Sequence, residues 1–277
     1  DLPRVRLGVF PTPFYRLDRL SEQYGRGIWI KRDDLCGVAL GGSKVRKLEF
    51  VLAEALDQGC DTVFTTGGAQ SNHAALTAAC AARLGMKCIL LLKRRGVTEH
   101  RGNLVLDELF GAEVRLLDMD SYDEIYAEMH RIGGTLEQAG HKCCYIPVGA
   151  STALGAVGYV SGAREIAVQA MAAGVRLGHI VSATGSGGTA AGLLLGAGLF
   201  LPGVKAPSTR SSPAWQGRPQ HCWSAPSSRK RMHFRWWSTW APAMPCRIRR
   251  IPPISRSWPG RRASCWIRST PGRPLPA

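Results

Sequence analysis

The first residue whose setting could support chemistry is Lys44, which ends the run Gly41-Gly42-Ser43-Lys44 and opens a helical pattern. Glycines let the backbone turn tightly, and the start of a helix places a lysine in positive potential that lowers the pKa of its amine. A lower pKa favours the neutral amine, which is the form that attacks a carbonyl group. Lys47 lies one helical turn further on and can reach the same end of such a site. The alternative is a solvated lysine in a glycine-rich turn, since most lysines are exposed.

A second turn, Gly67-Gly68-Ala69-Gln70-Ser71-Asn72-His73, joins a strand pattern to a helix pattern. Its small polar side chains and free backbone N–H groups suit a carboxylate or an oxygen anion. Ser71 and Asn72 are therefore candidate binding residues. The alternative is a plain helix cap, in which one of these two side chains accepts a backbone N–H. For His73 alone, a structural role is favoured over a catalytic one.

The third loop, residues 184–192, follows an apolar strand and precedes an apolar helix. Its glycines expose backbone N–H groups, its hydroxyls add donors, and the dipole of the following helix favours a bound anion. A nucleotide-binding turn could look similar, but this loop has no P-loop lysine and no early G-x-G-x-x-G precedes it. The pattern predicts a phosphate site made by Gly185, Ser186, Gly187, Gly188 and Thr189.

These loops need a scaffold in which strands run into helices. Apolar runs and helical patterns alternate along residues 27–200, which predicts βαβ units and an α/β fold with mainly parallel sheets and helices on both faces. Binding sites in such sheets lie where strands end and helices begin, and all three loops fall there. Strands are expected at 27–30, 62–66, 88–92, 113–117, 144–147 and 179–183, and helices at 44–58, 71–84, 103–110, 121–139, 154–173 and 189–200.

Two further segments, Lys31-Arg32-Asp33-Asp34 and Ile146-Pro147-Val148-Gly149-Ala150-Ser151, complete a pattern that covers roughly residues 4–205. With the three loops, this pattern resembles the family of D-cysteine desulfhydrases and 1-aminocyclopropane-1-carboxylate (ACC) deaminases. The resemblance implies a two-domain fold of the tryptophan-synthase-β type and pyridoxal 5'-phosphate (PLP) as the cofactor. It places residues 1–46 with 156–205 in a large cofactor-binding domain and residues 47–155 in a small α/β domain.

The resemblance also implies roles for individual residues. Lys44 matches the lysine that forms a Schiff base with PLP, and once freed it would act as the base. Lys47 matches a lysine near the phosphate, and residues 185–189 match the phosphate loop. Ser71 matches a catalytic serine beside the substrate, and Asn72 matches the asparagine at the ring hydroxyl of the cofactor.

Two departures from the family pattern lie at the edge of this site. Ser43 stands where the family usually has asparagine, and Ala74-Ala75 stand where a polar or basic pair is common. Both bear on the choice of substrate rather than on cofactor binding.

The composition changes at about residue 206. Fourteen of the sixteen net positive charges fall in residues 206–277, which hold 13 arginines, one lysine and no acidic residue. The same segment has seven of the eight tryptophans and 12 of the 17 prolines. A disordered basic tail that binds nucleic acid is one interpretation, although seven tryptophans fit it poorly. We favour a frameshift in a GC-rich gene, which leaves the large domain incomplete or aberrant and the tail not natively folded.

The genetic code tests this interpretation. If each original codon is the last base of one codon plus the first two bases of the next, Trp240-Ala241 specifies glycine and Met244-Pro245 specifies alanine, with Pro-Gly-Tyr permitted between them. In the same frame Cys265-Trp266 specifies leucine and Trp266-Ile267 specifies aspartate, followed by codons that permit Pro-Val-Tyr-Thr-Gly-Lys. Both restored strings are similar to segments of the resembled family. The codon restored from Thr270-Pro271 cannot encode the glutamate that ACC deaminases carry there, which favours the desulfhydrases.

The expected function is therefore that of a PLP-dependent lyase or deaminase, which converts D-cysteine to pyruvate, sulfide and ammonia. The alternatives are an ACC deaminase, an L-cysteate sulfo-lyase, and a catalytically dead frameshifted remnant that at most binds PLP. A basic nucleic-acid-binding module fused to a metabolic domain is a further alternative.

The remaining features bear on location and partners. No apolar run approaches the length of a membrane span, and the chain starts at Asp1 without a basic-then-apolar leader. The nine cysteines lack metal-ligand spacing and read as reduced thiols. We therefore expect a cytoplasmic protein that takes a small amino-acid substrate, with no metal, membrane or nucleic-acid partner. The resemblance implies a homodimer.

Overall fold

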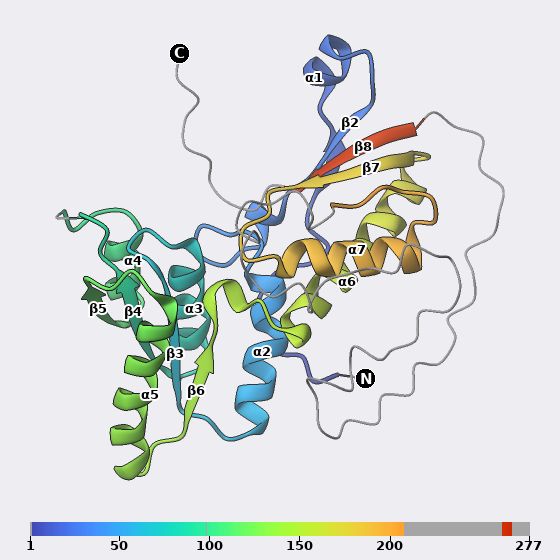
Figure 1. The fold of residues 1–277 in the computed structure, drawn as a ribbon. Coiled ribbons are helices and arrows are strands. Elements are labelled where there is room, and N and C mark those ends of the chain that lie inside the picture. Colours follow the sequence, from blue (N-terminus) through green and yellow to red (C-terminus); the bar gives the residue numbers. More distant parts are fainter. Residues whose placement is uncertain (1, 98, 208–261, 268–277) are drawn as a thin grey trace.

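Two four-stranded sheets form the framework of the molecule (Figure 1). The computed structural model describes residues 2–97, 99–207 and 262–267, the last of these as a backbone strand only. Among the described strands, β1 pairs antiparallel with β2 and every other pairing is parallel. The α/β class with mainly parallel sheets is thus confirmed.

The first sheet has the order β5-β4-β3-β6. Side chains alternate between the two faces along a strand. Val63 and Leu90 therefore pack with Leu76 of α3 on one face, whereas Phe64 and Ile89 pack against α5 on the other. Helices therefore cover both faces of this sheet. Its elements are β3 (Thr62–Gly68), α3 (Asn72–Arg83), β4 (Lys87–Lys93), α4 (Asn103–Leu109), β5 (Glu113–Leu117), α5 (Tyr122–Gln138) and β6 (Cys143–Ile146).

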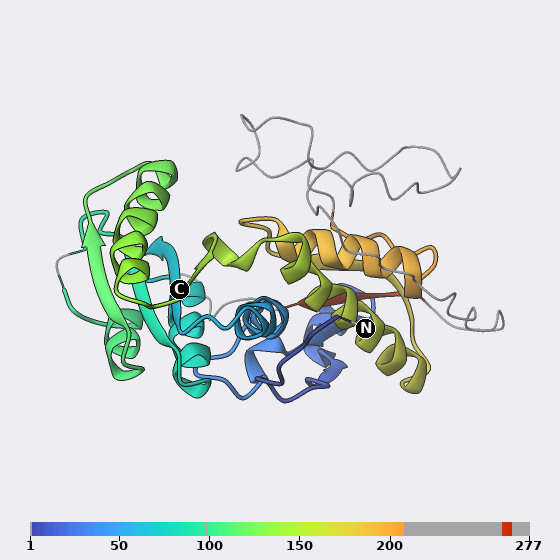
Figure 2. The same cartoon turned by 90° about the horizontal axis from the view of Figure 1, so that it is seen from below.

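The second sheet has the order β1-β2-β8-β7. A cluster that includes Tyr159, Ile166, Leu193 and Ile180 packs two helices, α6 and α7, together on one face of this sheet (Figures 1 and 2). The elements are β1 (Phe14–Arg16), β2 (Ile28–Lys31), α6 (Ala153–Ala172), β7 (Arg176–Ser182), α7 (Gly188–Phe200) and β8 (Arg262–Ile267).

Helix α2 (Val45–Asp57) runs between the two halves and is seen end-on at the centre of Figure 2. Its apolar face, which includes Leu48 and Leu52, joins the core around α3 and β3. On its other side α2 meets α6 so closely that a Cβ atom on Gly158 would lie 2.1 Å from the carbonyl oxygen of Arg46. The missing side chain at Gly158 therefore sets how near α6 comes to the first turn of α2.

The domain boundaries expected at 46/47 and 155/156 stay a prediction. Helices α2 and α6 run without a break across these two positions. The two sheets are thus joined by two continuous helices as well as by loops.

The elements expected between residues 27 and 200 are all present, with ends that differ by at most three residues. Sequence analysis missed four short elements, which are β1, α1 (Asp18–Gln23), and the 3-10 turns η1 (Asp33–Leu35) and η2 (Val148–Ala150). It also assigned no element to the tail, whereas β8 fills the place between β2 and β7. The restored-codon positions Trp240 to Pro245 and Thr270-Pro271 lie outside the described residues.

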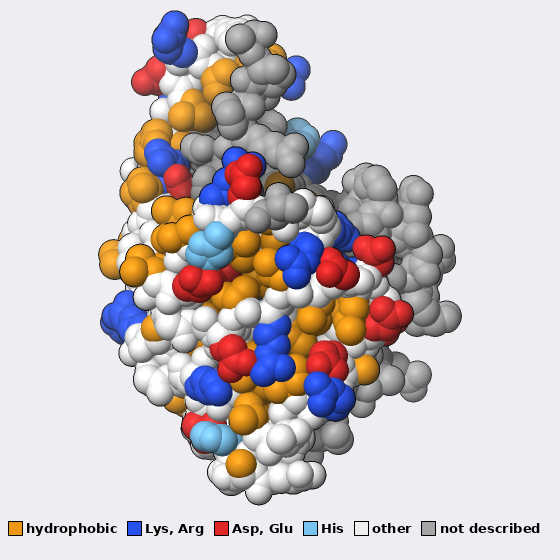
Figure 3. All heavy atoms as spheres, turned by 90° about the vertical axis from the view of Figure 1, so that its left-hand side faces the viewer, with side chains coloured by type: hydrophobic (Ala, Val, Ile, Leu, Met, Phe, Trp, Pro, Cys, Tyr) orange, Lys and Arg blue, Asp and Glu red, His pale blue; other side chains and the backbone are white. Residues whose placement is uncertain are grey.

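Acidic and basic side chains are interspersed on the side of the molecule at which β5 lies (Figure 3). Several of them form ion pairs, as Arg115 does with Glu113 and Arg131 with Glu128. Within the described part of the chain, no helix is both long and apolar enough to cross a bilayer.

Candidate active site

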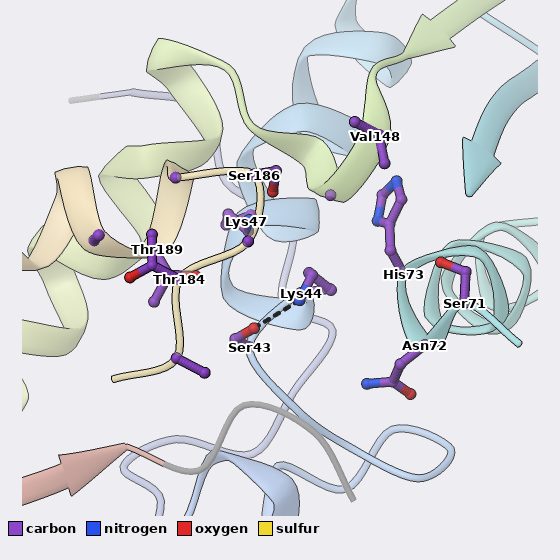
Figure 4. Close-up of a pocket in the computed structure, with 15 residues that line it drawn as sticks. Ser43, Lys44, Lys47, Ser71, Asn72, His73, Val148, Thr184, Ser186 and Thr189 are labelled. Atoms are coloured by element: carbon purple, nitrogen blue, oxygen red, sulfur yellow. Dashed lines mark hydrogen bonds between the residues drawn. The ribbon is translucent and has the colours of Figure 1, made fainter. Parts of the chain in front are cut away.

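A pocket of about 330 Å³ gathers the three loops singled out in the sequence (Figure 4). Helix α2 contributes its first turn, α3 contributes its start, and the loop between β7 and α7 closes another side. The residues that line it are Ser43, Lys44, Lys47, Ser71, Asn72, His73, Val148, Gly149, Ala183, Thr184, Gly185, Ser186, Gly187, Thr189 and Ala190.

Lys44 is the cap residue directly before α2, and its side chain points into the pocket (Figure 4). Its Nζ donates a hydrogen bond of 2.9 Å to Ser43 Oγ. Burial lowers the pKa of Lys44 to about 8, because the charged amine is poorly solvated there. The expected direction of the pKa is confirmed, with burial as its cause, and an amine this poorly solvated does not fit the alternative of a solvated lysine.

Lys47 lies one turn further along α2 and is only 1% exposed. Its Nζ donates a hydrogen bond of 3.4 Å to Ser151 Oγ. Burial, and then the charge on Lys44, lower the pKa of Lys47 to about 7. The pocket therefore holds two amines that both exchange protons near neutral pH.

The loop at residues 184–189 forms the wall of the pocket where β7 ends and α7 begins. Gly187 has a φ of 87°, a left-handed conformation that glycine adopts without strain and that turns the chain into the helix. Ser186 Oγ lies 2.7 Å from Ser151 Oγ. Gly188 is the one expected loop residue that does not line the pocket. It packs against Ser151, and a Cβ atom added to Gly188 would lie 2.7 Å from Ser151 Oγ.

Ser71 and Asn72 face the lysines from the start of α3 (Figure 4). Ser71 Oγ accepts a hydrogen bond from the backbone N–H of Ala74, so the capping role is confirmed, and the side chain still lines the pocket. Asn72 Nδ2 donates to the carbonyl oxygen of Gly41 at 3.0 Å, which ties this turn to the glycine turn before Lys44.

His73 is buried beside these residues. Its Nε2 lies 2.8 Å from Thr65 Oγ1 on β3. Burial, and then the charges of Lys44 and Lys47, hold the pKa of His73 well below its usual value, so the ring is neutral. This setting agrees with a structural role.

A buried ion network holds the first turn of α2 beneath the pocket. Arg46 is 2% exposed and binds Asp33 through two hydrogen bonds of 2.8 Å, from Nε and Nη2. Its guanidinium also donates to Glu165 on α6, which in turn accepts from Lys31 on β2. Tyr159 donates to Asp33 at 2.7 Å. The network connects three elements, η1, β2 and α6, to the helix turn that carries Lys44, and sequence analysis did not find it.

Several pocket residues were also missed as site residues. Ser43 was noted only as a departure from the family pattern, and Val148 and Gly149 only as part of a matching segment. Thr184 precedes the phosphate loop directly, so its position next to Gly185 was the available signal. Ala183 and Ala190 gave no chemical signal.

The residues present fit PLP, the cofactor that the resemblance implies. The volume lies within the range of cofactor pockets. A lysine with a pKa of about 8 suits an aldehyde, and Lys47 with the loop hydroxyls and the helix start suits a phosphate dianion. Among the described residues there is no group of three His, Cys, Asp or Glu side chains that could hold a metal ion.

Comparisons with known proteins identify the chain's relatives. It is 44% identical over 208 residues to a D-cysteine desulfhydrase of Salmonella choleraesuis, covering 73% of this chain and 62% of the relative. It is 42% identical over 197 residues to a Pyrococcus abyssi protein named provisionally as an ACC deaminase, covering 71% and 59%. A crystal structure described as an ACC deaminase homologue matches with a TM-score of 0.69 and 40% identity, covering 73% of this chain and 61% of the other.

The chain thus spans between 59% and 62% of the length of these relatives. A fungal L-serine ammonia-lyase from Rhizomucor miehei, at 18% identity and a TM-score of 0.53, shares the fold. The sequence profile of the family described as "Pyridoxal-phosphate dependent enzyme" matches residues 5–243. Because this match covers most of the chain and agrees with the two-lysine pocket, the chain belongs to the family of pyridoxal-phosphate dependent enzymes.

Proposed function

We propose that the chain acts as a D-cysteine desulfhydrase-like lyase, converting D-cysteine and water to pyruvate, sulfide and ammonia. One observation carries the proposal: Lys44, Lys47, the turn at Ser71-Asn72 and the loop at 184–189 border a single pocket. The 44% identity to a D-cysteine desulfhydrase supports this substrate.

Different residues of the pocket are assigned to different parts of the cofactor. Bound PLP supplies an electron-withdrawing ring that stabilises negative charge at the substrate Cα. We assign its phosphate to Lys47 and to Gly185, Ser186, Gly187, Gly188 and Thr189, and its ring hydroxyl to Asn72. Gly188 would act by shaping the start of α7, since it does not line the pocket.

Lys44 would take the proton from the substrate Cα. With a pKa of about 8, about one in ten of its amines is neutral at pH 7, far more than for an exposed lysine. Ser71 would bind the substrate carboxylate or assist proton transfer. Its Oγ accepts the hydrogen bond from Ala74 and, among the described hydrogen bonds, donates none, so its hydroxyl proton remains for the substrate.

The test measures products from three substrates after the purified chain is mixed with PLP. D-Cysteine should release sulfide and pyruvate together, and Lys44→Ala should abolish both. Ammonia from ACC without sulfide from D-cysteine would instead favour an ACC deaminase, which the similarity to the ACC deaminase homologue also permits. Sulfite from L-cysteate would identify a sulfo-lyase.

A catalytically dead remnant that binds PLP is the second candidate. The chain spans between 59% and 62% of the length of its relatives, and the restored codons suggest that residues from about 206 are read in a shifted frame. A visible absorption band with PLP, but no product from any of the three substrates, would support this candidate. Sequencing the DNA around the codons of Lys205 and Ala206 decides whether an inserted or deleted base is present.

We further infer a homodimer in the cytoplasm. The homodimer rests on the family, and the cytoplasm rests on the cysteines, since six in the described residues are free thiols. Sedimentation of the purified chain and its location in fractionated cells would test the two inferences separately.

A further inference from the structure

Ser151 lies just outside the pocket, between the two groups assigned to the cofactor phosphate. It follows the 3-10 turn η2 and precedes α6. It does not line the pocket itself, but Lys47 and Ser186, which it contacts, both do.

The hydroxyl of Ser151 has one hydrogen to donate and lone pairs to accept with. It accepts from Lys47 Nζ at 3.4 Å. Its hydrogen has two acceptors in reach, Ser186 Oγ at 2.7 Å and the carbonyl oxygen of Gly149 at 3.4 Å. The shorter contact is the stronger one. When Ser151 donates to Ser186, the hydrogen of Ser186 is left for an anion in the pocket.

The backbone around Ser151 is held in an unusual conformation that serves this contact. Gly149 and Ala150 have φ values of 71° and 48°, and for alanine this left-handed region is strained. A Cβ atom on Gly149 would lie 2.3 Å from Ser186 Oγ, and one on Gly188 would lie 2.7 Å from Ser151 Oγ. Two missing side chains therefore make room for the pair of hydroxyls.

We propose that Ser151 is a positioning residue for the phosphate end of the site. It fixes the direction in which Ser186 donates and holds the amine of Lys47 beside the loop. The proposal rests on the assignment of the phosphate to Lys47 and residues 185–189. It predicts that Ser151 affects affinity for the phosphate group and leaves affinity for the rest of the cofactor alone.

The experiment compares PLP with pyridoxal, which lacks the phosphate. Dissociation constants for both are measured on the full chain from the visible absorption of the lysine-bound form. In Ser151→Ala we expect PLP to bind about fivefold more weakly, the loss of one net hydrogen bond, while pyridoxal changes by less than about twofold. Inorganic phosphate should compete with PLP less well in the same variant.

Thr152→Ala is the matched control. Thr152 is the next hydroxyl along the chain and caps α6 by accepting from the N–H of Gly155 at 2.9 Å; among the described hydrogen bonds it makes none to Lys47 or Ser186. It should lower the thermal midpoint of unfolding but leave the ratio of PLP to pyridoxal affinity unchanged. If Ser151→Ala does not fold, Ser151→Cys keeps a side chain of similar shape with a weak sulfur acceptor, and the same ratio is measured.

The possible outcomes distinguish the phosphate assignment from the role of Ser151. A wild-type chain that captures both compounds but binds them equally well overturns the phosphate assignment and the role of Ser151 with it. A wild-type chain that prefers PLP, with the preference unchanged in Ser151→Ala or lost equally in Thr152→Ala, overturns the role of Ser151 alone.

Discussion

Lys44 Nζ donates its hydrogen bond to the hydroxyl of the residue directly before it, Ser43 Oγ, across 2.9 Å. Ser43 is 1% exposed, and this is the one hydrogen bond from the Lys44 amine among the described residues. The acceptor favours the charged form of the amine, against the burial that lowers its pKa to about 8.

Replacing Ser43 by alanine should therefore lower the pKa of Lys44 further. The expected result is that the pH midpoint for capture of PLP by Lys44 moves below that of the wild type. The measurement is the rate at which the visible band appears, followed from pH 6 to pH 9. Ser21→Ala, which removes a buried hydroxyl on α1, is the control and should leave the midpoint in place. A midpoint that stays or rises in Ser43→Ala contradicts the role of this acceptor.

The buried ion pair of Arg46 predicts a large loss of stability when it is broken. Arg46→Met leaves the buried carboxylate of Asp33 without its charged partner and leaves Glu165 paired with Lys31 alone, which should cost about 3–5 kcal/mol. Arg131→Met removes the exposed pair with Glu128 and should change stability little. Urea unfolding of the cofactor-free variants gives both values, and equal small losses would show that the network adds no stability.

Asp107 predicts a pH dependence of stability that is separate from the pocket. Both carboxylate oxygens are buried without a hydrogen-bond partner among the described residues, and burial raises the pKa of Asp107 to about 7. At pH values between the ordinary pKa of an aspartate and about 7, the unfolded chain releases this proton whereas the folded chain keeps it. The stability of the folded chain therefore falls as the pH rises through this range. Asp107→Asn cannot ionise and should gain stability relative to the wild type from pH 4 to pH 7, then hold that gain. Thermal midpoints at stepped pH test this, and parallel curves would refute it.

Gln70 connects the turn that carries Ser71 and Asn72 to the loop before α4. Its side chain donates to the carbonyl oxygen of Arg101 at 2.8 Å and accepts from the N–H of Asn103 at 2.9 Å. Gln70→Ala should loosen residues 94–103, which contain three arginines, and so speed cleavage there by trypsin. Limited proteolysis with mass mapping measures the rate. Gln138→Ala, an exposed glutamine at the end of α5, is the control; an unchanged rate in Gln70→Ala would mean that other contacts hold the loop.

The sequence allowed the repeating pattern of the fold to be predicted, because a strand such as β4 is a short run of consecutive apolar residues, whereas a helix such as α2 repeats its apolar residues at helical spacing. The same approach located the three site loops, since a glycine-rich turn at the start of a helix is visible as residue types. Short elements such as α1, with six residues, carry too few periods to be recognised.

The supporting contacts could not be predicted. Arg46 meets Asp33 from 13 residues away and Glu165 from 119 residues away, and nothing local distinguishes these charges from exposed ones. Strand β8 was missed for a different reason. The space between β2 and β7 is filled through backbone hydrogen bonds, which every residue other than proline can complete, so its occupant need not show a strand pattern.

The close passage of α6 over α2 at Gly158 has a consequence for mutational tolerance. A substitution there collides with the backbone of Arg46 rather than with a flexible side chain, so relief requires the two helices to separate. Separation would displace the turn that carries Lys44 and Lys47. In a saturation library selected for PLP capture, position 158 should accept glycine alone, although it neither lines the pocket nor bears any chemical group.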